Sequence, residues 1–206
     1  MRATTVLTML TVALVASPAS AGPPSDRVRE YTDAVIRVLE NGALRPADQR
    51  AAVRRIAQDA FDFTETAQRA LGRHWQGRSP EEREEFVGMF ADLLERTYIS
   101  RIDRYGGERL RVTGEKVDGD RAVVVGRVVT KRGTEVPVEA RMLEKARQWL
   151  IYDVAIGNVS LIGNYRAQFD RIIRTSSYPE LVRRLRDRNA FLDEQADGET
   201  RPRRAP

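Results

Sequence analysis

The chain has 206 residues, with 35 Lys and Arg against 30 Asp and Glu, a formal net charge of +5, one histidine and no cysteine. Without cysteine the chain forms no disulfide framework and offers neither a thiolate nucleophile nor a thiolate metal ligand. The net charge is mild for a nucleic-acid-binding protein, and the length suits one domain with a sizeable core.

The first 21 residues have the pattern of a secretory signal. A single basic residue, Arg2, precedes an uncharged apolar run that ends in Ala19-Ser20-Ala21, which fits the small-residue cleavage rule. The run is too short for a membrane-spanning anchor. The pattern predicts export and cleavage after Ala21, and an unstructured or membrane-anchored N-terminus is the alternative.

Three helices are predicted next. Ser25 can cap the first, which ends near Asn41-Gly42, and Pro46 is placed to begin the second. A short third helix is expected over residues 63–71, with Gly72 as its stop signal.

A longer helix follows, with a strong start signal in "SPEE". Ser79 is placed as the cap, Pro80 as the first helical residue and Glu82 as the partner of the serine in a capping box. The helix is expected to run to about Tyr105, with an apolar face that is wide for a surface helix.

After Gly106-Gly107 the apolar period changes from 3.6 to 2. The segments "RLRVTGEKV", "RAVVVGRVVTK", "TEVPVEARMLEK" and "QWLIYDVAI" predict four strands joined by short turns, the first turn being Asp118-Gly119. Sequential strands with tight turns form an antiparallel meander. Strict alternation would place the even-numbered residues, among them Tyr152 and Val154, on one apolar face.

Two helices close the chain, one from about Ser160 and one starting at "YPE" (178–180). Residues 196–206 form a polar tail that we expect to be disordered. The predicted fold class is α+β, a four-stranded curved antiparallel meander with helices packed on one face. Residues 22–195 are expected to form a single domain.

The sequence matches no catalytic or nucleotide-binding motif well. Gly157 and Gly163 are too far apart for a dinucleotide fingerprint, and no Lys-Ser or Lys-Thr follows them as a phosphate loop requires. His74 is the only histidine, so a Ser-His-Asp triad would have to use it and a zinc site would have one imidazole and no thiolate. A packed or partly exposed side chain without a catalytic role is therefore favoured. The acidic run Glu81 to Glu85 is explained by the positive end of a helix dipole.

Residues 166–188 carry seven arginines. A solvated helix face and a surface for a phosphate-bearing or acidic partner are both open interpretations. Nucleic acid is disfavoured, because no aromatic residues alternate with these arginines as in single-strand binders. The wide apolar faces are equally compatible with a filled core and with a cavity.

The sequence resembles the MlaC family, also called the toluene-tolerance family, over about Phe61 to Phe191. The resemblance rests on "LG..W", "SP.E..EF...F..LL...Y" and "YDV...NVSLI.NYR.QF" in the order helices, meander, helices. The chain departs from the family pattern at Asn158, where glycine is common. Asparagine also tolerates a left-handed turn, so the corner should be kept.

The resemblance implies a periplasmic phospholipid-binding shuttle without enzymatic activity, metal or cofactor, its only bound molecule being the phospholipid cargo. Its partners would be an inner-membrane ABC transporter complex containing an MCE-domain protein and an outer-membrane lipoprotein complex, which together maintain outer-membrane lipid asymmetry. Acyl chains would occupy an apolar cavity between the sheet and the helices. The residues expected to contact lipid are Phe86, Phe90, Leu93, Leu94, Tyr98, Val138, Ala140, Met142, Tyr152, Val154, Leu161, Ile162, Tyr165 and Phe169.

Three alternatives remain open at this stage. A carrier for another lipid, such as a hopanoid, would use the same kind of cavity. A small enzyme on a cone-shaped α+β scaffold would need acidic or histidine side chains pointing inward, and Asp153 falls on the opposite strand face from Val154. An interaction module based on the basic C-terminal helices would have a filled core.

Overall fold

The computed structural model describes residues 23–100 and 102–200, apart from the side chains of residues 103 and 194–200. The predicted signal segment 1–21 lies outside these residues. The elements in chain order are α1 (Pro24–Leu39), α2 (Pro46–Ala60), α3 (Phe63–Leu71), the 3-10 turn η1 (Gly72–His74), α4 (Pro80–Ile99), the 3-10 turn η2 (Ile102–Arg104), β1 (Arg109–Asp118), β2 (Arg121–Val129), β3 (Glu135–Lys145), β4 (Gln148–Ile156), β5 (Val159–Ser160), α5 (Leu161–Thr175) and α6 (Tyr178–Thr200).

The predicted α+β class is confirmed, with five strands in place of four. The sheet is an antiparallel meander in the order β1-β2-β3-β4-β5. Gly157 and Asn158 both have positive φ, 58° and 66°, which is the backbone of a tight hairpin turn. The turn folds β5 back along β4 for two residues before α5 begins, and so short a strand leaves no alternating pattern in the sequence.

Helix starts were predicted better than helix ends. Ser79 and Glu82 form the expected capping box at α4, but α4 ends at Ile99, before the predicted end near residue 105. The predicted cap at Ser25 is wrong: α1 starts one residue earlier, and the backbone N–H of Ser25 donates to the Glu115 carboxylate of β1 at 2.8 Å. Helix α6 continues to Thr200, into the segment expected to be a disordered tail.

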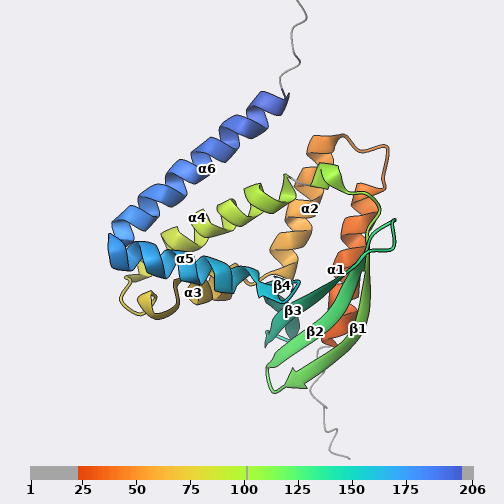
Figure 1. Cartoon of the computed structure of the whole chain (residues 1–206), viewed down its shortest axis with the longest axis horizontal. Helices are drawn as coiled ribbons and strands as arrows, with labels where there is room; N and C mark the ends of the chain where they lie inside the picture. The colour runs from red at the N-terminus through yellow and green to blue at the C-terminus, as the bar shows by residue number, and fades with distance from the viewer. Residues whose placement is uncertain (1–22, 101, 201–206) are drawn as a thin grey trace, which may run out of the picture.

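The molecule has two parts that meet at β4 (Figure 1). Helices α3 to α6 lie together on one side, while α1 and α2 accompany the sheet. Each part has its own apolar cluster. The helical cluster centres on stacked and edge-on rings of Phe86, Phe90 and Phe169. The sheet cluster includes Val28 of α1 and Met142 of β3.

A β-bulge in β4 changes which side chains share a face. Arg141 pairs with Asp153 but Met142 pairs with Ile151, so Tyr152 is an extra residue in the strand. Ile151 and Val154 consequently face the sheet cluster. The predicted shared face of Tyr152 and Val154 is therefore wrong, because the bulge interrupts the alternation.

Candidate functional site

The first apolar cavity, called cavity A, has a volume of about 390 Å³ and lies where α2, α4, β4 and the start of α5 meet. Its lining side chains are overwhelmingly apolar. They are Ala57, Phe61, Phe63, Leu94, Glu95, Tyr98, Ile99, Val154, Ile156, Val159, Ser160, Leu161 and Asn164. At its rim three apolar side chains are open to solvent: Tyr98 is 42% exposed, Ile156 57% and Val159 62%.

The second apolar cavity, called cavity B, has a volume of about 310 Å³ and lies between α1 and the sheet. It is lined by Val28, Thr32, Leu110, Val112, Val124, Val125, Gly126, Val128, Val138, Glu139, Ala140, Ile151, Val154 and Ile156. Val154 and Ile156 line both cavities. Two apolar compartments therefore adjoin at a shared stretch of β4.

Gly126 keeps strands β1 and β2 close together beside cavity B. A Cβ atom at this position would lie 2.8 Å from the carbonyl oxygen of Arg111 and 3.1 Å from Leu110 Cδ1. Because backbone atoms yield little, any side chain at residue 126 would push β1 away from β2. The glycine thus helps to set the shape of the cavity floor.

Six of the fourteen residues predicted to contact lipid line a cavity. Leu94, Tyr98 and Leu161 line cavity A, Val138 and Ala140 line cavity B, and Val154 lines both. The other eight are placed in packed regions. Phe86, Phe90, Leu93, Ile162, Tyr165 and Phe169 belong to the helical cluster or pack on it, Met142 is fully buried in the sheet cluster, and Tyr152 lies under the Arg69 guanidinium of α3 at 4.0 Å.

Several cavity residues come from the N-terminal helices, which the family motifs did not cover. Phe61 and Phe63 flank the link between α2 and α3, and Val28 with Thr32 projects from α1. Val28 lies at helical spacing from other apolar residues of α1, so the sequence alone indicates that it belongs to an apolar face. The sequence of a helix does not show which other element its apolar face packs against. The position of Val28 beside a cavity could therefore not be predicted.

Asp153 fixes the position of α5 against β4. Its buried carboxylate accepts hydrogen bonds from the Ile162 backbone N–H at 3.0 Å, the Ser160 hydroxyl at 2.6 Å and the Arg141 guanidinium at 3.1 Å. All three donors are explained by capping a helix start and pairing across strands. The Asp153 carboxylate thus has a structural role. It is a poor candidate for the inward-facing acid that an enzyme on this scaffold would need.

Most of the basic C-terminal surface is neutralised within the chain. Arg174 pairs with Asp170, Arg183 and Arg184 pair with Glu180, and Arg186 pairs with Glu85. Such exposed pairs contribute little to stability. They do lower the net positive charge that α5 and α6 present to a partner.

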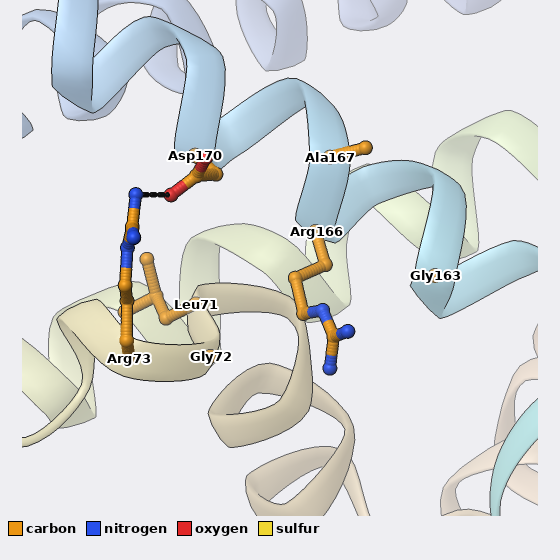
Figure 2. A pocket seen from close by; sticks show the side chains of 7 residues that line it. All are labelled: Leu71, Gly72, Arg73, Gly163, Arg166, Ala167 and Asp170. Atoms are coloured by element: carbon orange, nitrogen blue, oxygen red, sulfur yellow. Dashed lines mark hydrogen bonds and ion pairs between the residues drawn. The ribbon is translucent and has the colours of Figure 1, made fainter.

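A charged pocket of about 500 Å³ lies between η1 and α5 (Figure 2). Arg73 reaches Asp170 at 2.6 Å, and the side chain of Arg166 lies over Gly72. His74 Nε2 lies 2.9 Å from the same Asp170 carboxylate. The hydrogen bond from His74, followed by the one from Arg73, holds the pKa of Asp170 below its usual range. The single histidine is thus used in an ion-pair cluster that joins η1 to α5.

No group of three or more His, Asp or Glu side chains among residues 23–100 and 102–200 is arranged to hold a metal ion. Within the same ranges, no helix combines the length and apolar character needed to cross a membrane.

The fold and the two cavities define a small α+β protein that keeps ligand-sized apolar space between a curved sheet and its helices. The family model described as MlaC protein matches residues 29–187. The chain therefore belongs to the MlaC family.

Two known proteins can be compared with it. The chain is 23% identical, over 122 residues, to the intermembrane phospholipid transport system binding protein MlaC of Haemophilus influenzae. That match spans 57% of this chain and 57% of the relative, so it reaches just over half of the relative's length. The structure is similar to that of a phospholipid-binding protein from Ralstonia solanacearum in complex with a phospholipid, with a TM-score of 0.73 and 25% identity over 85% of this chain and 99% of that one.

Proposed function

We propose that this chain binds one phospholipid, with its acyl chains in cavities A and B, and carries it through the periplasm between two membranes. The observation that carries the proposal is the pair of adjoining apolar cavities that share Val154 and Ile156. A two-chain lipid has two apolar parts joined at a headgroup, which suits two compartments joined along one wall. Family membership and the phospholipid in the Ralstonia structure support the same conclusion.

The proposed path runs between an inner-membrane ABC transporter complex with an MCE-domain protein and an outer-membrane lipoprotein complex. Residues 1–21 would direct export as a signal peptide, which would then be cleaved after Ala21. The activity is transport without bond chemistry, and it needs only an apolar container that can open. The name of the Haemophilus relative, an intermembrane phospholipid transport system binding protein, supports this assignment.

Native mass spectrometry of the mature protein, produced in a bacterial host, tests the proposal. We expect a species heavier than the polypeptide by the mass of about one phospholipid, and the same lipid in a solvent extract. An extract that contains a hopanoid and no phospholipid would assign a different cargo. A bare polypeptide mass with an empty extract, even after incubation with phospholipid vesicles, would overturn the proposal.

A further inference from the structure

Glu95 is a charged residue in an otherwise uncharged cavity wall. Among the described residues that line cavity A, it is the one ionisable side chain apart from the phenol of Tyr98. Its side chain is only 10% exposed. It lies one helical turn before Tyr98, at the rim of the cavity, so it is close to where a bound lipid would leave the apolar space.

Two side chains of the neighbouring helix α2 contact this carboxylate. Arg54 Nε lies 2.7 Å from Glu95 Oε2, and the Gln58 amide donates to Oε1 at 3.2 Å. Both flank Ala57, another lining residue of cavity A. The Arg54 side chain is 48% exposed, so its charge stays partly in water and the ion pair contributes little to stability.

We propose that Arg54 and Glu95 form a headgroup subsite that selects a lipid with one phosphate and one cationic amine. The inference rests on the proposed function and adds the headgroup chemistry to it. When the lipid enters, the phosphate accepts hydrogen bonds from the Arg54 guanidinium and the ammonium donates to the Glu95 carboxylate. One ion pair within the protein is exchanged for two between protein and lipid, and no charge is left unpaired.

The same geometry discriminates against anionic headgroups. A phosphatidylglycerol phosphate can still pair with Arg54, but its glycerol carries no positive charge to replace Arg54 beside Glu95. The Glu95 carboxylate would then have to share the single Arg54 cation with the phosphate while held in a mostly apolar wall, which is unfavourable. Glu95 is thus the residue that sets selectivity, and Arg54 is the residue that holds the phosphate.

Competition between two lipids tests this selectivity directly. The delipidated mature protein is incubated with vesicles of equal parts phosphatidylethanolamine and phosphatidylglycerol, and the bound lipids are quantified after re-isolation. For Glu95→Gln we expect the bound phosphatidylglycerol to phosphatidylethanolamine ratio to rise about tenfold, the worth of one charge-assisted contact. Glu84→Gln removes the same charge from an exposed position of α4 and should leave the ratio unchanged.

The phosphate contact has its own variant. Arg54→Gln should lower the retention of both lipids by about tenfold, since both carry the phosphate. Arg55→Gln, at the neighbouring exposed position of α2, is the matched control and should retain both. Inorganic phosphate in excess should not change either lipid's occupancy. Displacement by phosphate alone would assign a free-anion site and overturn the headgroup subsite.

The outcomes separate the two proposals. If the wild-type protein takes up no lipid from either vesicle component, the shuttle function and the subsite are both overturned. If it takes up lipid, and folded Glu95→Gln binds the two headgroups in the wild-type ratio, the shuttle function stands and the headgroup subsite is overturned.

Discussion

Substituting Val154 by glutamate tests the location of the cargo. Val154 is the residue of β4 that, with Ile156, lines both cavities, so a charge there affects both compartments at once. The side chain is only partly buried and borders both cavities, which gives the longer glutamate room in the protein alone. The change is therefore aimed at cargo binding more than at folding.

The magnitude follows from the hydrocarbon that the carboxylate displaces. A glutamate that keeps its water excludes the methylenes nearest to it, and each methylene kept in the cavity contributes about 0.8 kcal/mol. Loss of about five methylene contacts costs about 4 kcal/mol, which corresponds to an affinity about 1,000-fold weaker. Burying the carboxylate without a partner would cost several kcal/mol more than leaving it hydrated. The loss of affinity worked out for the hydrated glutamate is therefore the smallest loss to expect.

The assay is lipid occupancy by native mass spectrometry after incubation with phospholipid vesicles, with circular dichroism to verify folding. Val117→Glu is the matched control, because Val117 is exposed, lies on β1 and lines neither cavity. We expect Val117→Glu to keep wild-type occupancy and Val154→Glu to lose lipid. Wild-type occupancy in a folded Val154→Glu protein would refute the assignment of the acyl chains to these cavities.

Three further predictions concern stability. Asp153→Ala should lower the free energy of unfolding in urea by about 3 kcal/mol, because it leaves the buried Ile162 N–H without an acceptor and removes the hydrogen bonds from Ser160 and Arg141, and a loss below about 1 kcal/mol would contradict this. Phe90→Leu should cost about 1–2 kcal/mol by the same assay yet keep lipid, as expected for a filled cluster; loss of lipid from the folded variant would place cargo there. Burial raises the pKa of Tyr178 to about 12, above the unfolded value of about 10. The unfolded state therefore releases this proton first, and stability present below pH ~10 is lost as pH rises through about 12; Tyr178→Phe should flatten that part of the pH curve, and an unchanged slope would count against it.

Local signals predicted the elements well because their causes are local. The capping box of Ser79 and Glu82 satisfies backbone donors within one helical turn, and the left-handed turn at Asn158 depends on its own side chain. Each of these features is complete within a few residues. The local sequence is therefore sufficient to predict the capping box and the left-handed turn.

The candidate site depended on non-local packing, and prediction was correspondingly weaker. The bulge at Tyr152 arises because β4 has one residue more than β3 over the paired stretch. Neither strand's own sequence indicates this difference. The bulge turns Trp149 and Ile151 toward the sheet cluster in place of Leu150 and Tyr152. The aromatic residues of α4 and α5 have the same apolar spacing whether they line a cavity or fill a core, and here Phe86 and Phe90 fill one.

The proposed cargo determines how release must occur. Two acyl chains of about 15 methylenes each represent on the order of 20 kcal/mol of hydrocarbon kept from water. Escape through water would expose that surface and would be far too slow for transport. Cavity A, however, ends in the exposed apolar side chains of Tyr98, Ile156 and Val159. A partner that covers this rim with its own apolar surface would offer the chains a path that never meets water. The proposed cargo therefore predicts handover in a docked state, and the exposed apolar rim suits such docking.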